Sequence, residues 1–349
     1  MVVQICCSVD FAYFLKRLRE DYPNEQILGY FYNPNIHPYA EFMLRYHDCQ
    51  RVAKKHGIEL ILGEYDLDGW FEYVKGQEKE PERGERCLSC FDYRLSSTVK
   101  FAKSKNEKKI TTTLLMSPKK SHDQLKKSLA KICQKENLEF IAPDYRKEGG
   151  SQAQMSLAKK ENLYHQNFCG CMYALKDMSK FSLEAGLMSP VNGQILPGSI
   201  EERIKFYSEV IKSENPQIRK DKFINYRLLF ARVKFNDKVI KSYFLYGSHF
   251  ERNLVKFSIA QSCEEFYSDK ECIRMISLAK FCEISGVKFS SMSEFLSTPL
   301  SIDDELKFRD KILKADSFSP IIIVENLYED RVKIEVTSKL YLDVREILA

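Results

Sequence analysis

The sequence contains no run of about 20 consecutive apolar residues, the length that a membrane-spanning helix needs. Its first residues also lack a basic segment followed by an apolar core, the pattern of a secretory signal peptide. These absences predict a cytoplasmic protein in a reducing compartment, with no membrane partner. A strong charge bias is missing too, because 54 Lys and Arg residues stand against 49 Asp and Glu residues. The resulting net charge of +5 permits a nucleic-acid partner but does not require one.

What is present is an ordinary globular composition, with 44% hydrophobic and 30% charged residues among 349, and room for two domains. In the first 175 residues, short apolar runs alternate with helical patterns, which predicts an α/β domain with a parallel sheet. The predicted strands are Val2–Cys6, Gln26–Tyr30, Glu59–Leu62, Lys109–Thr113 and Glu139–Ile141. The predicted helices are Asp10–Asp21, Tyr39–His56, Leu67–Gly76, Glu85–Lys105, Ser121–Glu136 and Ser151–Glu161.

A segment rich in Gly, Pro, Ser and Asn, residues 186–199, reads as a linker between two domains. We therefore predict a metal-binding catalytic domain at 1–185 and a smaller α+β accessory domain at 200–349. In the second domain we expect a β-hairpin around Asn236-Asp237-Lys238, helices through Ile284, and late strands. The hairpin strands are Tyr226–Phe235 and Val239–Tyr246, and the late strands are Pro320–Glu325 and Arg331–Val336.

Three compact cysteine clusters stand out in the first domain, namely Cys6-Cys7, Cys87-x-x-Cys90 and Cys169-Gly170-Cys171. The first pair ends a predicted strand, where parallel α/β sheets bind their ligands. The second pair lies one helical turn apart, so both sulfurs can face one centre. In the third cluster, Gly170 permits a close approach of the backbone. Clustered thiols in a reducing compartment indicate zinc or iron–sulfur ligation.

Asp10, four residues after Cys6, has two interpretations. Its carboxylate could cap the following helix, or it could act as a hard oxygen ligand beside two soft sulfurs, a set that suits iron. A structural zinc site needs only four ligands, and dithiol exchange needs only one Cys-x-x-Cys, so both leave cysteines unused. The isolated cysteines read as small buried residues in helices and stay outside the predicted site, namely Cys49, Cys133, Cys263, Cys272 and Cys282.

Six strings, taken together and in order, resemble the QueH family of epoxyqueuosine reductases: ICCSVD, YFYNPNIHP, ERCLSCFDYRL, TTTLLMSPKK, DYRKEGG and LYHQNFCGCMYAL. They span about residues 1–176, and we expect the resemblance to end at the linker. It implies a Rossmann-like core related to nucleotide-binding folds, with a [4Fe-4S] cluster and an additional mononuclear iron. It also implies that the epoxide of epoxyqueuosine in tRNA is reduced to give queuosine. Many members carry a third cysteine where this chain has Asp10, and an arginine where it has His165.

From the resemblance we expect the six clustered cysteines to divide between the cluster and an iron that Asp10 helps to hold. We expect Cys7 and Asp10 to be the catalytic residues, with Asp10 as a metal ligand or a proton donor. The electrons would come from a donor protein or another reductant. No sulfur is assigned to either metal at this point. Candidates for contacts to tRNA phosphates are Arg86, Arg94, Lys119, Lys120, Arg146 and Lys147. Candidates for contacts to the unstacked base are Tyr32, Asn33, Asn35 and Gln166.

Two other functions stay open. An ATP-dependent tRNA thiolase would need a glycine-rich phosphate loop after the first strand, and this strand is followed by Cys-Cys-Ser-Val-Asp instead. A metal-stabilised RNA-binding module without catalysis would need no reductant. Conversion of epoxyqueuosine in tRNA distinguishes the reductase from both.

Overall fold

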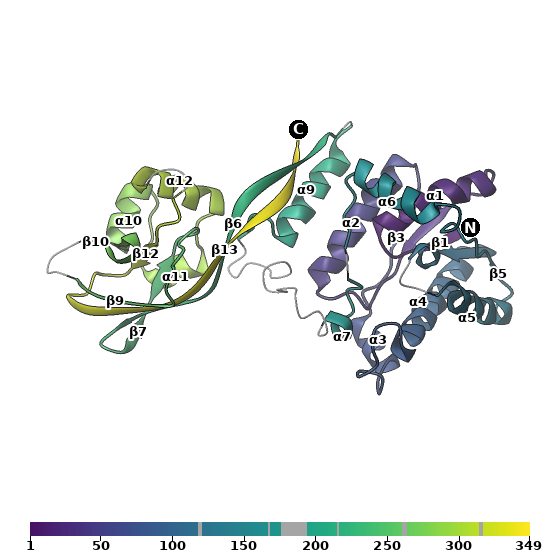
Figure 1. Cartoon of the computed structure of the whole chain (residues 1–349), viewed down its shortest axis with the longest axis horizontal. Coiled ribbons are helices and arrows are strands. Elements are labelled where there is room, and N and C mark those ends of the chain that lie inside the picture. Colours follow the sequence, from purple (N-terminus) through teal and green to yellow (C-terminus); the bar gives the residue numbers. More distant parts are fainter. Residues whose placement is uncertain (118–120, 167, 176–193, 215, 260–263, 314–316) are drawn as a thin grey trace. The chain divides into compact units, whose positions relative to one another are not determined.

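The computed structural model describes the chain except for residues 118–120, 167, 176–193, 215, 260–263 and 314–316 (Figure 1). Two compact units are present. One comprises Met1–Leu187, Arg203–Arg219 and Ile347–Ala349, and the other comprises Met188–Glu202 and Lys220–Glu346. The predicted domain bounds, 1–185 and 200–349, stay a prediction, and residues 186–193 of the predicted linker lie outside the described residues. None of the described helices combines the length and the apolar character needed to span a bilayer.

The first unit is built on a five-stranded parallel sheet in the order β3-β2-β1-β4-β5, which confirms the predicted α/β class. Its strands are β1 Val2–Ile5, β2 Leu28–Phe31, β3 Glu59–Leu62, β4 Lys109–Thr112 and β5 Glu139–Phe140. Each falls where the sequence predicts it, within about two residues at either end. The helices also agree: α1 Ser8–Asp21, α2 Tyr39–Lys55, α3 Leu67–Tyr73, α4 Glu85–Ser104, α5 His122–Lys135 and α6 Gly150–Lys160. The short α7, Met172–Leu175, follows the third cysteine cluster.

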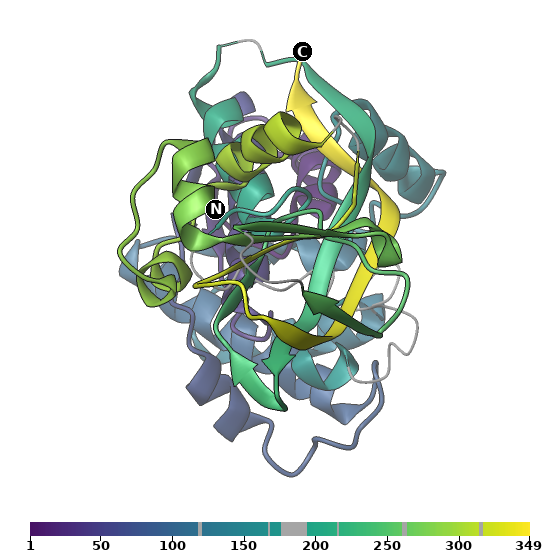
Figure 2. The ribbon, with the colours of Figure 1, turned by 90° about the vertical axis from the view of Figure 1, so that its left-hand side faces the viewer.

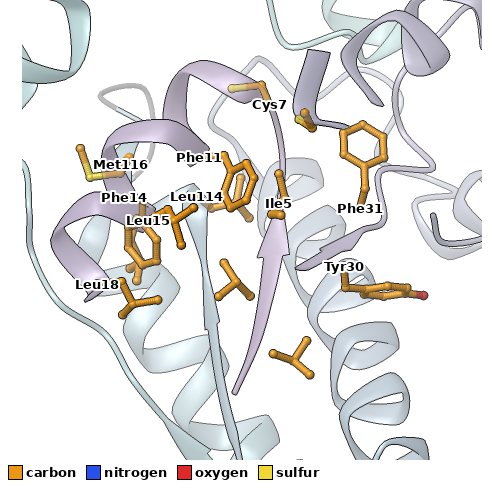
Figure 3. Packing of buried hydrophobic residues seen from close by; sticks show 14 of the residues in the cluster. Ile5, Cys7, Phe11, Phe14, Leu15, Leu18, Tyr30, Phe31, Leu114 and Met116 are labelled. Carbon is orange, nitrogen blue, oxygen red and sulfur yellow. The ribbon is translucent and has the colours of Figure 1, made fainter. Parts of the chain in front are cut away.

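Helices cover both faces of this sheet, and neighbouring residues of β2 identify the faces. Tyr30 stacks on Phe101 of α4 with ring centroids 4.1 Å apart, whereas Phe31 packs against Phe42 of α2 at 5.2 Å. Because successive strand residues point to opposite faces, α4 and α2 lie on opposite sides. β1 is buried along its whole length at the centre of this core (Figure 3).

The second unit contains two four-stranded sheets, with orders β10-β11-β12-β8 and β7-β6-β13-β9. The long strands β6, Ile218–Phe235, and β13, Asp330–Leu348, run side by side (Figure 2). Strand β12 contributes to two cores. Ile322 and Val324 lie in the core between the two sheets, and Ile321 and Ile323 lie in the core beneath the helices α10, α11 and α12. The remaining elements are β7 Lys238–Ile240, β8 Ser242–Phe244, β9 Leu254–Ile259, β10 Glu265–Ser268, β11 Ile273–Ser277, β12 Ile321–Val324, α9 Ile200–Lys212, α10 Leu278–Ser285, α11 Met292–Ser297 and α12 Ile302–Ile312.

The predicted hairpin is present, because β6 and β7 pair across Asn236 and Asp237, which both have positive φ angles. The expectation of helices through Ile284 is wrong for most of that stretch. It forms β9, β10 and β11 before α10 begins at Leu278, and β9 alternates exposed and buried residues with the period of two typical of a strand. The second hairpin strand is split between two sheets as β7 and β8. Cys49 and Cys133 are buried as expected, but Cys272 is exposed, and Cys263 lies outside the described residues.

Candidate metal and substrate site

The first cysteine pair lies at the carboxyl end of β1, the central strand. To one side of β1 lie β2 and β3, and to the other lie β4 and β5, so the pair sits where the strand order reverses. Cys7 is the residue immediately before α1, with an extended backbone and no side-chain cap. The interpretation of Asp10 as helix cap is therefore wrong. Asp10 lies in the first turn of α1, and its carboxylate is directed to Cys6 instead.

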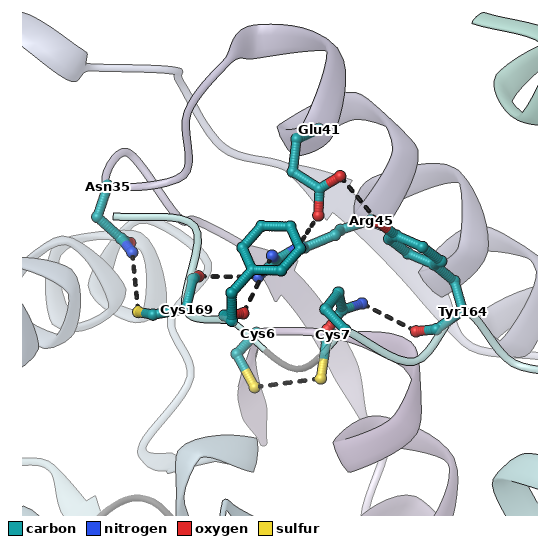
Figure 4. Close-up of polar contacts among 9 residues, drawn as sticks. Cys6, Cys7, Asn35, Glu41, Arg45, Tyr164 and Cys169 are labelled. Atoms are coloured by element: carbon teal, nitrogen blue, oxygen red, sulfur yellow. Dashed lines mark hydrogen bonds and ion pairs between the residues drawn. The ribbon is translucent and has the colours of Figure 1, made fainter. Parts of the chain in front are cut away.

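Cys6, Cys7 and Asp10 bring their three donor atoms within 4.8 Å of one another. The Cys6 thiol donates to Asp10 Oδ2 at 3.1 Å. It also lies 3.9 Å from Cys7 Sγ (Figure 4). Thr113, just after β4, accepts from the Cys6 amide at 3.0 Å, and Gln154 of α6 donates to Asp10 Oδ1 at 2.6 Å. Two neighbouring elements therefore hold these donors in place.

Acidic groups packed this closely resist ionisation. The hydrogen bond with Cys6, with burial as a second cause, raises the pKa of Cys7 well above its usual value. Burial raises the pKa of Asp10, against hydrogen bonds from Cys6 and Gln154 that lower it. A bound cation would reverse both effects, since it favours thiolate and carboxylate. The donor set therefore has the chemistry of a metal site.

A second sulfur group forms where α4 approaches the third cysteine cluster. Cys90, Cys169 and Cys171 pack together around the fully buried Trp70. Burial raises the pKa of Cys90 to about 12, and that of Cys171 is raised for the same reason. Cys87, one turn before Cys90, is half-buried, and its sulfur accepts from the Arg83 amide at 3.2 Å.

Gly170 allows the third cluster to approach the loop after β2. Ile36 and Cys171 form a β-bridge, and the His37 amide donates to the Gly170 carbonyl at 2.9 Å. Gly170 has a φ of +94°, and a Cβ added there would lie 3.1 Å from a methyl group of Ile36. The backbone conformation favours glycine, and a side chain at this position would crowd Ile36. The predicted tight approach is confirmed.

Arg45 of α2 contacts the loop that carries the third cysteine cluster. The sequence did not single out this arginine as a site residue. Its guanidinium donates to the carbonyl of Cys169 at 2.9 Å and lies over the ring of Phe168 (Figure 4). It also pairs with Glu41 at 2.7 Å, although only 5% of Arg45 and none of Glu41 is exposed. The signal in the sequence was a Glu–Arg pair four residues apart on the buried face of a helix.

We expect Arg45→Met to lower the free energy of unfolding of the metal-free protein by about 3–5 kcal/mol, because Glu41 loses its buried partner. Urea unfolding followed by circular dichroism measures this. The double variant Arg45→Met/Glu41→Gln should recover part of the loss, since no charge is then left unpaired. Equal stabilities of the single variant and the wild type would contradict the predicted role.

A cavity of about 350 Å³ opens beside these donors. Of the predicted site residues, it is lined by Cys6, Cys7, Asp10, Asn33, Asn35, Arg94, Gln166 and Cys169. Arg94 donates to Asn33 Oδ1, and Asn33 in turn donates to the Ile5 carbonyl at 2.9 Å. The Asn35 amide nitrogen lies 3.9 Å from Cys169 Sγ, and its buried Oδ1 has no hydrogen-bond partner among the described residues. Residues of the wall that the sequence analysis did not select include Val9, Ile36, Arg45, Leu114, Met155 and Phe168.

Other predicted contact residues lie outside the cavity wall. Arg86 is buried and donates to loop carbonyls, including that of Glu78 at 3.2 Å. Tyr32 is buried, and its carbonyl accepts from Gln4. Arg146 donates to the carbonyl of Ser117, which does line the cavity, and Lys147 is 77% exposed. Lys119 and Lys120 lie outside the described residues.

The family model described as epoxyqueuosine reductase QueH matches residues 1–177. An epoxyqueuosine reductase QueH of Helicobacter pylori is 34% identical over 358 aligned positions, covering 97% of this chain and 97% of that protein. The Haemophilus influenzae protein of the same name is 40% identical over 158 positions, covering 45% of this chain and 64% of that protein. The first of these matches continues far past the linker, so the expected end of the resemblance at that point is wrong.

Among solved structures, the U34-tRNA thiolase NcsA from Methanococcus maripaludis with its [4Fe-4S] cluster is similar over 62% of this chain and 73% of that one. Its sequence identity to this chain is 12% and the TM-score is 0.31.

Proposed function

Because this chain belongs to the epoxyqueuosine reductase QueH family and is an oxidoreductase, we propose that its cysteine-lined cavity reduces epoxyqueuosine within tRNA. The observation that carries this is the convergence of thiols and a carboxylate on one small cavity. The reaction breaks both C–O bonds of the epoxide, forms a C=C bond and releases water. It consumes two electrons and two protons. We propose a cytoplasmic setting, with electrons from a donor protein or another reductant.

We assign the donors to two sets. Cys90, Cys169 and Cys171 pack together, and Cys87 is added to them because it lies one helical turn before Cys90. Cys87, Cys90, Cys169 and Cys171 would hold a [4Fe-4S] cluster, for which four thiolates are the usual ligands. Cys6, Cys7 and Asp10 would hold the additional iron, with the mixed sulfur and oxygen set that suits it. Of the first set, Cys169 borders the same cavity as the second set, whereas Cys87, Cys90 and Cys171 lie outside the cavity wall. When bound, the metals would supply single electrons and polarise the epoxide oxygen.

The cavity admits one modified base and no duplex. Its volume of about 350 Å³ is within the range of small-ligand sites, so the wobble base must leave its stack to enter. Asn35 would offer its unpartnered Oδ1 to the substrate, and Arg94 would keep Asn33 oriented through the bond to its Oδ1. Three apolar side chains of the cavity wall would exclude water from the reacting carbons, namely Phe168, Met155 and Leu114. The assignment of Arg86, Arg146, Lys147, Lys119 and Lys120 to phosphate contacts remains a prediction.

We expect anaerobically purified protein to be brown, to contain more than four irons per chain, and to convert epoxyqueuosine in tRNA when a chemical reductant is added. Mass spectrometry of the digested tRNA detects the loss of one oxygen atom. A tRNA-binding protein with full metal content and no conversion would favour the non-catalytic module. Sulfur incorporation that depends on ATP would favour the thiolase.

A further inference from the structure

The sheet β7-β6-β13-β9 of the second unit has one buried face and one exposed face. Its inner positions, including Val233, Val255, Val332 and Ile334, join the core between the two sheets. The outer positions alternate with these, as the exposed and buried residues of β9 show. The helices α10–α12 pack on the other sheet. Where β9, the last residues of β6 and the first residues of β13 lie, the side chains of the outer face are exposed or half-buried.

Cations dominate that outer face where the four strands lie together. They are Arg232 and Lys234 on β6, Arg331 and Lys333 on β13, and Lys256 on β9. Among the described outer-face positions where the four strands lie together, the one carboxylate is Glu335. Three of the five cations form ion pairs with it. Lys333 and Lys234 lie 2.9 and 3.1 Å from its oxygens, and Arg232 bonds it as well. Hydrogen bonds from these three cations lower the pKa of Glu335 to about 2.

The arrangement is unfavourable for the protein alone. Lys333 and Lys256 are direct partners across β13 and β9, and like charges directly opposite each other destabilise a sheet. One carboxylate cannot neutralise five cations. A polyanion bound across the face would remove this repulsion and release counterions.

Phe230 shows what kind of polyanion fits. It lies two residues before Arg232 on the same face, is 48% exposed, and has the Arg232 guanidinium 5.4 Å from its ring centre. An exposed aromatic ring beside an arginine is a platform on which an unpaired base can stack. An acidic protein would use the charges but not the ring face.

We propose that this outer face, defined by Phe230, Arg232, Lys234, Lys256, Arg331 and Lys333, is a second binding surface for tRNA. The inference rests on the proposed function for the choice of RNA, and it extends the site from one base to a larger part of the molecule. It also gives a role to the unit that lies outside the family model, which ends at residue 177.

The test compares two triple variants of the full-length protein. Lys256→Gln/Arg331→Gln/Lys333→Gln removes cations from the face, and Lys280→Gln/Lys288→Gln/Lys307→Gln removes as many from the helical side of the same unit. Fluorescence anisotropy with labelled tRNA over a range of salt concentrations gives the dissociation constant and its salt slope. We expect the first variant to bind at least about tenfold more weakly at low salt, with the slope reduced by about one per cation. The second variant should bind as the wild type does.

Phe230→Ala should weaken binding by about tenfold with an unchanged salt slope, because stacking releases no counterions. Circular dichroism verifies folding of each variant. Unchanged tRNA affinity and slope in the first triple variant would overturn the proposal, and slower reduction by a protein donor in that case would identify a protein-docking face. The binding readout needs no turnover. A wild type that binds tRNA through this face but does not reduce it would instead refute the proposed function.

Discussion

Asp10→Asn should remove the additional iron and slow epoxide reduction by more than about 100-fold, while most of the cluster iron remains. Asparagine preserves the size of the side chain but replaces an anionic oxygen with a neutral amide, which is a poor partner for iron. Loss of groups that only support a metal ligand costs about 10–100-fold, so loss of a ligand should exceed that range. Metal analysis, electron paramagnetic resonance and single-turnover conversion of the tRNA measure these effects.

The matched control is Glu20→Gln, because Glu20 is a carboxylate on the same helix α1 whose side chain is 52% exposed and pairs with Arg17. It should retain wild-type iron content and rate. If Asp10→Asn kept both the iron count and the rate of the wild type, Asp10 would be neither a ligand nor a proton donor.

Cys90→Ser should yield a nearly colourless protein without measurable epoxide reduction. Cys90 packs with Cys169 and Cys171 in a buried cluster on α4 and the third cysteine loop, so a hydroxyl there replaces one of four proposed sulfur ligands. Visible absorbance, iron and sulfide content and the conversion assay report the loss.

Cys133→Ser provides the comparison for this second variant. Cys133 is also buried, in α5, and burial alone raises the pKa of its thiol to about 11. The substitution should keep the colour and the activity, with only a modest loss of stability. Equal iron content in Cys90→Ser and Cys133→Ser would exclude Cys90 as a cluster ligand.

The first unit was predictable because its signals are local. Each β-strand of the parallel sheet is a short apolar run between helical patterns, and the position of Cys6 and Cys7 at a strand end follows from that pattern. The second unit was predicted less well. The run Leu254–Ile259 has a period of two, but it was assigned to helix, and only its pairing with β13 establishes the strand.

The sequence by itself determined the fold class of the first unit, the three sulfur clusters and the close backbone approach that Gly170 permits. These depend on periodicity, residue chemistry and backbone freedom, all of which are properties of short segments. Tertiary structure alone decided that Cys90 joins Cys169 and Cys171, and that Arg45 secures the loop of the third cysteine cluster. It also decided that the cations of three strands gather on one open face. These groupings join residues far apart in the chain, and their proximity depends on how the strands order and the helices pack.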